Sequence, residues 1–363
     1  MATQQDVLAA LGTVSDPQAH KDLVSLGAIQ DLTVQDGVAR FTVSLGPAAW
    51  LQQAQIEAAC RAAVSALPGV QEVEVRRGVA VPAGRPVSGK VDIAGVKHVV
   101  AVASGKGGVG KSTVSVNMAV ALRQFGARTG LLDADIYGPS IPVLMGINRM
   151  PESSGQRIQP LEHHGVRLMS LGFLLPPGSA PVIWRGPMVA GAIQQFLREV
   201  DWGTLDYLLV DLPPGTGDAQ LTLCQQIPLS GVVVVMTPQD LAVGIAAKAL
   251  AMFRQLKVPV LGIVENMGTF LCPHCGKETS VFSKGGGARA AEQLGVPFLG
   301  SIPLDAAVCE TGDAGQPILV RDPAAPIADI VRRITATMAG RVQAQAAEAG
   351  PLITIVGTPG GSA

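Results

Sequence analysis

The sequence predicts an α/β protein, in which a small α+β domain precedes a domain built on a doubly wound, mostly parallel sheet. Short apolar runs alternate with longer helical segments from residue 96 to about residue 340. Residues 1–78 show a different order, helix–strand–strand–helix–strand, and residues 79–95 between the two parts are rich in Gly and Pro, as in a linker. With 363 residues, of which 48% are hydrophobic, the chain is long enough for two cores.

Residues 1–78 are expected to form one compact unit. Asp36-Gly37 predicts a hairpin turn between its first two strands, because Gly adopts positive φ at little cost. The expected elements are, in order, a helix near Val7–Leu11, strands at Ile29–Val34 and Val38–Leu45, a helix at Leu51–Leu67, and a last strand marked by Val70, Val73 and Val75.

Residues 96–340 alternate between buried strands and helices. The strands are apolar throughout, as is typical of a parallel sheet covered on both faces. They are expected at Val99–Ala103, Thr129–Leu132, Tyr207–Val210, Val232–Met236, Val260–Val264 and Phe298–Ile302, with helices such as Thr113–Phe125 and Leu241–Leu256 between them. Residues 341–363 are expected to be a flexible tail.

Charge and composition argue against several classes of partner. The net charge is −1 and the longest basic runs are pairs, whereas a nucleic-acid surface needs clustered Lys and Arg. No apolar run approaches the roughly 18–20 residues that cross a bilayer. Lys21 is the first basic residue, so a secretory signal is not expected. We therefore expect a cytoplasmic protein that binds neither nucleic acid nor membrane.

A glycine-rich loop after the first strand of the large domain indicates a nucleotide site. Gly105, four further residues and Gly110-Lys111-Ser112 form a phosphate-loop pattern between a predicted strand and a predicted helix. Its backbone N–H groups and the helix N-terminus favour phosphate. Lys111 is expected to reach the β- and γ-phosphates of ATP, and Ser112 to bind Mg²⁺. The expected ATP-binding residues are Gly105, Lys106, Gly107, Gly108, Val109, Gly110, Lys111, Ser112 and Thr113.

Lys106 is a second lysine in this loop. The segment KGGVGKS resembles the deviant Walker A loop of partition, septum-positioning, nitrogenase iron-protein and Mrp ATPases. This resemblance implies that Lys106 reaches the ATP of a partner subunit in a homodimer. The alternative is that Lys106 is a solvated surface lysine.

Two acidic segments follow strand ends. DADIYGPS, from Asp133, resembles switch I, where Asp135 would orient the attacking water or assist Mg²⁺; the alternative is a helix cap. DLPPGTGD, from Asp211, resembles Walker B joined to switch II. Asp211 would hold Mg²⁺ through water, and the Gly215 amide would sense the γ-phosphate. The resembling families hold adenine where Asn266 and Pro303 lie here, although Asn266 also suits a turn.

Cys272 and Cys275 lie in a C-x2-C turn whose spacing suits one tetrahedral metal or one edge of a cluster. Two ligands are too few for a stable site in one chain, whereas a two-fold dimer supplies four. A bridging [4Fe–4S] cluster, a Cys₄ zinc site and a redox pair remain open. His274 lies in the loop but is not expected to be a ligand. The other cysteines, Cys60, Cys224 and Cys309, are expected to be packed thiols.

GKGGVGKST, DADIYGPS, WRGPM, DLPPGTGD, ENM and CPHCG occur in this order, and together they resemble the Mrp/ApbC family of iron–sulfur cluster carrier ATPases. The resemblance covers about residues 96–340. It implies a homodimer that hydrolyses ATP slowly, binds a [4Fe–4S] cluster between subunits through Cys272 and Cys275, and passes it to apoproteins. Residues 1–78 resemble a small iron–sulfur-assembly domain, but LGPAAWLQQ lacks the cysteine that many of its members have, which favours a docking role.

Two rival functions share the phosphate loop. A partition or septum-positioning ATPase would act on DNA or membrane. The members that bind membrane resemble each other in having a basic amphipathic helix near the C-terminus, and the C-terminal segment of this sequence has no such helix. An electron-donating reductase of the nitrogenase iron-protein type would have its cysteines in two separate loops. The close spacing of Cys272 and Cys275 favours the carrier.

Overall fold

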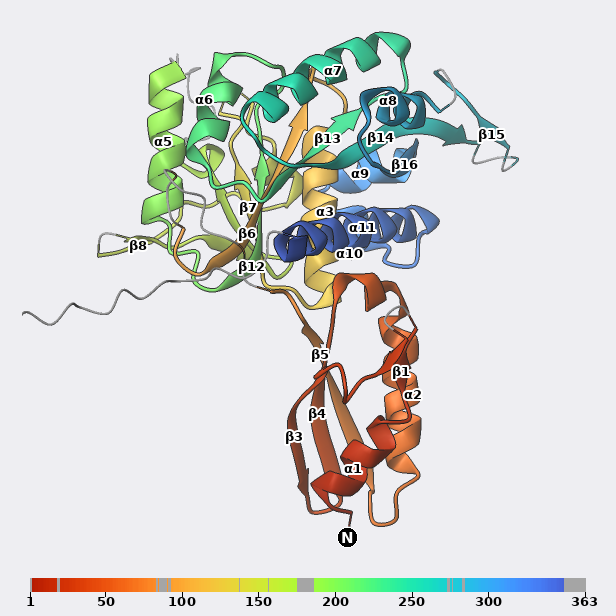
Figure 1. The fold of residues 1–363 in the computed structure, drawn as a ribbon. Coiled ribbons are helices and arrows are strands. Elements are labelled where there is room, and N and C mark those ends of the chain that lie inside the picture. Colours follow the sequence, from red (N-terminus) through yellow and green to blue (C-terminus); the bar gives the residue numbers. More distant parts are fainter. Residues whose placement is uncertain are drawn as a thin grey trace, which may run out of the picture.

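The chain folds into a small unit and a large unit placed end to end (Figure 1). The structure, a computed structural model, describes residues 2–17, 20–82, 84, 90, 93–136, 138–155, 157–174, 186–272, 275, 277–282 and 285–348. We call residues 2–79 the small unit and residues 93–348 the large unit.

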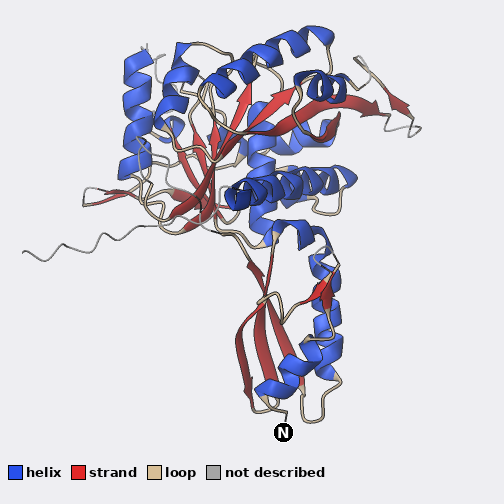
Figure 2. Cartoon of the chain, viewed as in Figure 1, coloured by secondary structure: helices blue, strands red, loops and turns tan. Residues whose placement is uncertain are grey.

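The small unit has a three-stranded sheet with helices on one side (Figure 2). β3 and β4 are antiparallel, and β4 and β5 are parallel. Asp36 and Gly37 both have positive φ, which confirms the predicted hairpin turn. The elements are α1 (Gln4–Leu11), β1 (Ser15–Asp16), β2 (Lys21–Asp22), β3 (Ile29–Gln35), β4 (Val38–Leu45), η1 (Pro47–Gln52), α2 (Gln53–Ser65) and β5 (Glu72–Val79).

The large unit is built on a nine-stranded sheet within the described residues. Its order is β10-β11-β7-β12-β6-β13-β14-β15, with β16 also paired to β14, and the central strands are parallel. β12 and β13 are buried at every residue, which accounts for their continuous apolar runs. The strands are β6 (Val96–Ser104), β7 (Thr129–Asp133), β10 (Leu161–His163), β11 (Val166–Ser170), β12 (Leu205–Asp211), β13 (Gly231–Met236), β14 (Val260–Leu271), β15 (Glu278–Thr279) and β16 (Phe298–Leu304); a separate hairpin pairs β8 (Ser153–Ser154) with β9 (Arg157–Ile158).

Helices cover both faces of this sheet, as a doubly wound fold requires. α3, α10 and α11 share one apolar core, and α5, α6, α7 and α8 share the other. The helices are α3 (Lys111–Phe125), α4 (Ile141–Leu144), η2 (Leu171–Phe173), α5 (Gly186–Glu199), α6 (Asp218–Gln226), α7 (Asp240–Gln255), α8 (Gly286–Leu294), α9 (Ala306–Asp313), α10 (Ile318–Arg321) and α11 (Pro326–Glu348). The predicted α/β class is confirmed.

Several boundaries differ from the predictions. The helix expected from Leu51 begins as a 3₁₀ turn at Pro47, and α2 starts only at Gln53. β14 continues seven residues beyond Val264, through polar residues that end the apolar run. The tail expected from residue 341 was placed too early, because α11 continues to Glu348 and buries Val342.

Trp50 joins the two units. Its ring is 2% exposed and stacks on Phe125 of α3 with centroids 4.9 Å apart. It also meets the edge of Tyr207 on β12 at 6.4 Å, and its Nε1 donates to the Leu45 carbonyl at 2.9 Å. Because α3 is the helix that follows the phosphate loop, the small unit is packed directly against a nucleotide-site element.

Candidate functional site

The phosphate loop lies between β6 and α3, as predicted. Gly108 and Gly110 have φ of 76° and 78°, a region that side chains rarely adopt. A Cβ at Gly107 or Gly108 would meet no atom within 4 Å, so this side of the loop is open, whereas a Cβ at Gly105 would collide with Ile245. The loop is therefore shaped to bring backbone N–H groups close to a ligand.

Asp211, at the carboxyl end of β12, is fully buried and surrounded by donors. Lys111 Nζ lies 2.7 Å from its Oδ2, and Ser112 Oγ donates to the same oxygen at 2.5 Å. Ser115 Oγ donates to Oδ1 at 2.6 Å. The predicted Lys111, Ser112 and Asp211 are thus brought together. Ser115 was missed, although it lies four residues after Lys111 on the same helix face.

Asp133 is a second buried carboxylate beside Asp211, since the two residues pair across β7 and β12. Burial, and then the neighbouring Asp211 carboxylate, raise the pKa of Asp133 from 3.8 to about 7. It accepts hydrogen bonds from Ser170 Oγ at 2.9 Å and from the amides of Asp135 and Ile141. Asp133, rather than Asp135 alone, is therefore the residue around which the switch I-like segment is organised.

Lys106 is half-buried and tied to its own chain. Its Nζ donates to Gln239 Oε1 at 2.8 Å, and Thr237 Oγ1 donates to the same oxygen at 2.7 Å. Gln239 was not anticipated, because it follows β13 without any motif. The amide of Gly215, which has φ of 101°, donates to the Ser104 carbonyl at 2.9 Å. The Lys106 ammonium group and the Gly215 amide are thus both hydrogen-bonded within the subunit. Each would have to exchange this partner for a phosphate oxygen in order to contact a nucleotide.

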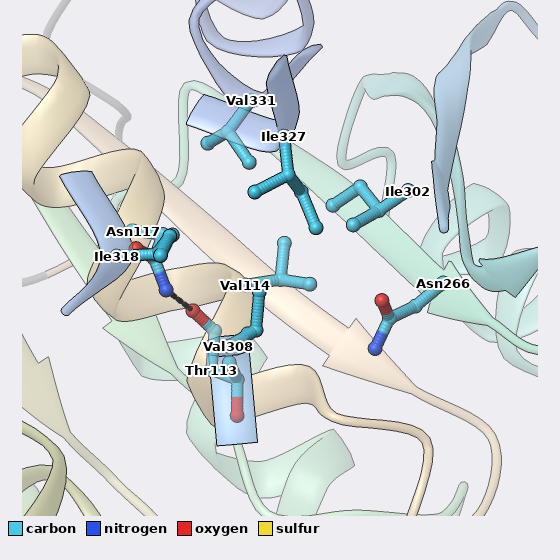
Figure 3. A pocket seen from close by; sticks show the side chains of 9 residues that line it. All are labelled: Thr113, Val114, Asn117, Asn266, Ile302, Val308, Ile318, Ile327 and Val331. Atoms are coloured by element: carbon cyan, nitrogen blue, oxygen red, sulfur yellow. Dashed lines mark hydrogen bonds between the residues drawn. The ribbon is translucent and has the colours of Figure 1, made fainter. Parts of the chain in front are cut away.

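The two expected base contacts lie beside each other, because β14 and β16 pair through Asn266 and Ile302. Asn266 and Pro303 line one groove of about 170 Å³ together with Gly110, Thr113, Asp305 and Cys309. Asn266 Nδ2 donates to the Val109 carbonyl at 2.8 Å. A smaller apolar cavity shares Asn266 and Thr113 with this groove, and Figure 3 shows Asn266 on one side of it and Thr113, Val114 and Asn117 on the other.

Cys272 and Cys275 lie between β14 and β15, on what we call the cysteine hairpin (residues 270–279). Cys272 is half-buried and Cys275 exposed, and the Cys272 amide donates to the Lys277 carbonyl at 3.0 Å. His274 lies outside the described residues, as do Trp184 and Arg185 of the WRGPM motif. In the part of the chain that the structure describes, no three His, Cys, Asp or Glu side chains are grouped as a metal site.

The remaining cysteines differ among themselves. Cys60 and Cys224 are buried, and burial raises their thiol pKa values to about 11 and about 12, so thiolate formation is disfavoured. The expectation of a packed thiol is wrong for Cys309, which is exposed on α9 because it faces the groove. Among the described helices, none is long and apolar enough to cross a membrane.

Known proteins resemble the chain over nearly its whole length. The family model described as NUBPL iron-transfer P-loop NTPase matches residues 95–339, and the one described as iron-sulfur cluster assembly protein matches residues 4–75. The iron-sulfur cluster carrier protein of Synechocystis sp. is 46% identical over 349 residues, covering 94% of this chain and 98% of that protein. Its counterpart in Deinococcus radiodurans is 47% identical over 338 residues, covering 93% and 95%.

A solved structure is similar to part of the chain in sequence and fold. The nucleotide-binding protein of Archaeoglobus fulgidus, in complex with ADP, is 40% identical and superposes with a TM-score of 0.57. The match covers 65% of this chain and 92% of that protein. The shared part corresponds in size to the large unit.

Proposed function

The chain belongs to the family of NUBPL-type iron-transfer P-loop NTPases, and we propose that it is an ATPase that carries iron–sulfur clusters and passes them to apoproteins. The observation on which this rests is that one strand, β14, contributes to a complete phosphate-loop site through Asn266 and ends at a pair of accessible cysteines. The cysteine pair distinguishes a cluster carrier from a positioning ATPase, because positioning on DNA or membrane does not require paired cysteines.

The residues around the phosphate loop fit ATP and Mg²⁺. The open side of Gly107 and Gly108 leaves room for phosphate, and Lys111 provides a cation at the same edge of the sheet. Ser112 and Asp211, already in contact, would hold Mg²⁺, which prefers oxygen ligands. The ion supplies charge neutralisation for phosphoryl transfer when bound. Lys111 would then exchange Asp211 for phosphate, because both are anions competing for one ammonium group.

Lys106 supports a homodimer. If it acts on a partner's ATP, it must leave Gln239, a neutral acceptor whose hydrogen bond is weaker than one to phosphate. Gln239 would therefore hold the lysine near the loop until the partner's nucleotide arrives. The slow hydrolysis expected of the family fits a catalytic group that is engaged elsewhere in the single subunit.

The cluster is cargo, which we place at Cys272 and Cys275. Each chain contributes two accessible thiols on one hairpin, and two chains contribute the four thiolates that a [4Fe–4S] cluster takes. Zinc would use the same four ligands. We place the protein in the reducing cytoplasm, where cysteines are kept as thiols. The small unit we assign to docking of clients or regulation, since its Cys60 is buried.

Anaerobic reconstitution with iron and sulfide tests the proposal. Wild-type protein should acquire the visible absorption of a cluster, and Cys272→Ala/Cys275→Ala should not. Cys309→Ala is the matched control, because Cys309 is exposed, as Cys275 is, but lies on α9. Full cluster uptake by the double variant, or none by the wild type, would contradict carriage.

A further inference from the structure

We propose that a groove at the C-terminal end of α3 is a docking site for an acidic segment of a partner protein, whose carboxylates Arg123 and Arg332 would bind. The groove lies between α3, the turn from β10 to β11, and α10. We call it the arginine groove, and its lining residues include Arg123, Gln124, His164 and Pro323. The inference goes beyond the proposed function, because it depends on neither a nucleotide nor a cluster.

Arg123 is the cation on one side of the groove. It is exposed in the last turn of α3. A Cβ at Gly165 would lie 2.7 Å from its Nε, so the guanidinium group runs along the turn between β10 and β11. Among the residues that the structure describes, Arg123 has no hydrogen bond or ion pair. A ligand can therefore bind its donors without breaking an existing contact.

Arg332 of α11 is a second cation, which neutral groups hold in place at the same groove. Its Nε donates to Gln124 Oε1 at 3.2 Å, and its Nη2 donates to the Pro323 carbonyl at 2.6 Å. Gln124 Nε2 in turn donates to the Leu319 carbonyl at 2.7 Å. Because these acceptors carry no net charge, they orient the guanidinium group without neutralising it. Its remaining N–H groups can bind a carboxylate at a small cost in side-chain entropy.

The surrounding elements do not cancel this charge. No Asp or Glu is among the described residues that line the groove, and the sequences of α3 and α10 contain none. Glu162 lies in β10, and Asp322 directly follows Arg321, which is itself exposed. Asp329 of α11 is already paired with Arg333. The groove therefore presents a positive surface, although the whole chain has a net charge of −1.

The shape and the walls of the groove favour an extended peptide. Val120, Val320 and Pro323 make the walls partly apolar, and burial lowers the pKa of His164, so its ring adds no charge at neutral pH. The volume is about 560 Å³ with eight lining residues, whereas the groove at Asn266 has about 170 Å³ and thirteen. The arginine groove is thus shallow. A small ligand would stay largely exposed in it, whereas a peptide can lie along it.

A segment that combines carboxylates with apolar side chains matches this surface. Carboxylates accept paired hydrogen bonds from a guanidinium group, and clusters of arginine are a recurring means of binding acidic motifs. A nucleic acid needs a longer row of cations and has no counterpart for apolar walls. The groove also lies next to the small unit (Figure 1), because Phe125, two residues after Arg123, stacks on Trp50. A partner bound here would lie within reach of both units.

Fluorescence anisotropy with the full-length protein tests the proposal. The probe is a fluorescein-labelled peptide in which Glu and Leu alternate over about ten residues, or about 33 Å of extended chain. The same peptide with Gln in place of Glu is its control. We expect the wild type to bind the Glu peptide at least about tenfold more tightly, as two ion pairs of moderate strength would give. Arg123→Glu should weaken binding of the Glu peptide at least about tenfold and barely change that of the Gln peptide.

Arg198→Glu is the matched control, because it makes the same change of charge at an exposed arginine in the last turn of α5, which packs on the other face of the sheet. It should bind the Glu peptide as the wild type does. Arg332→Gln, which removes the charge and keeps a polar side chain, should weaken binding by about threefold or more. Arg123→Glu provides the test alone if Arg332→Gln does not fold. Affinity for an ATP analogue should be unchanged in all three variants, since Lys111 lies at the opposite end of α3.

Cross-linking locates the bound peptide. A Glu peptide that carries a benzophenone group should be attached to residues 120–124, 164–165 or 319–323, as mapped by mass spectrometry. The docking site is overturned if the wild type does not prefer the Glu peptide, if Arg198→Glu weakens binding as much as Arg123→Glu, or if the cross-links lie only elsewhere. Tighter binding of a labelled single-stranded oligonucleotide than of the Glu peptide would also overturn it.

Discussion

Asp133 lies at the carboxyl end of β7, where the side chain is 1% exposed and Asp211 is its neighbour on β12. Burial and this second carboxylate raise its pKa from 3.8 to about 7. The folded protein therefore keeps a proton on Asp133 at pH values where the unfolded chain has lost it. Replacing Asp133 by Asn, which never ionises, should change how the free energy of unfolding depends on pH.

The sign and size follow from the two pKa values. A raised pKa of an acid stabilises the fold below the unfolded pKa of 3.8, and this stabilisation is lost as the pH rises through about 7. The loss amounts to about 1.4 kcal/mol per pH unit, or about 4 kcal/mol in all. Asn keeps only one accepting oxygen for Ser170 and the two amides, which costs about 1–2 kcal/mol at every pH. Asp133→Asn should thus be less stable near pH 4 and about 2 kcal/mol more stable near pH 8.

Urea unfolding followed by circular dichroism, without nucleotide or Mg²⁺, measures this between about pH 4 and about pH 8. Asp6→Asn is a suitable control, because hydrogen bonds from Thr3 lower the pKa of the Asp6 carboxyl. The stability that the Asp6 carboxylate provides should therefore be lost as the pH falls towards 4, which is opposite to the pH dependence expected for Asp133. If the stability curves of wild type and Asp133→Asn are parallel over the whole range, Asp133 is not protonated in the folded protein and the reasoning fails.

Substitutions at three other sites test separate contacts. Lys111→Ala should weaken ATP binding at least about tenfold in calorimetry, and should lower stability by about 3 kcal/mol because it leaves Asp211 buried without its cation; wild-type stability would contradict the buried ion pair. Lys106→Ala should lower phosphate release by about a hundredfold or more and weaken ATP binding much less, whereas Gln239→Ala should not slow phosphate release; normal turnover in Lys106→Ala would remove the cross-subunit role. Trp50→Ala should lower the free energy of unfolding by about 3–5 kcal/mol, and Trp50→Phe by much less; equal small effects would show that the Trp50 ring does not hold the units together.

Much of the large unit could be predicted from the sequence because its strands are buried on both faces. A continuous apolar run such as Gly231–Met236 is typical of a central strand that is buried on both faces. The phosphate loop was equally predictable, since strand, glycines and helix are all local features. Lys111, Ser112 and Asp211 were assigned from motifs, and the structure brings them together.

The contacts that the sequence did not reveal are those between distant residues with no motif. Ser115 and Gln239 bind Asp211 and Lys106, yet each is an ordinary polar residue on its own element. The importance of Asp133 depends on its pairing with Asp211, which is a property of strand order. The irregular pairing of β14 with β16 between Asn266 and Phe270 was hidden for a related reason: residues 265–268 include Glu, Asn and Gly, which predict the end of a strand rather than its continuation to Leu271.

The central claim is that two copies of this chain share one iron–sulfur cluster through Cys272 and Cys275. Native mass spectrometry of the anaerobically reconstituted protein, together with iron and sulfide analysis, tests this most directly. We expect a dimer whose extra mass corresponds to one [4Fe–4S] cluster, with about two iron and two sulfide per chain. A metal-containing monomer, or a dimer containing one zinc ion and no sulfide, would contradict the account.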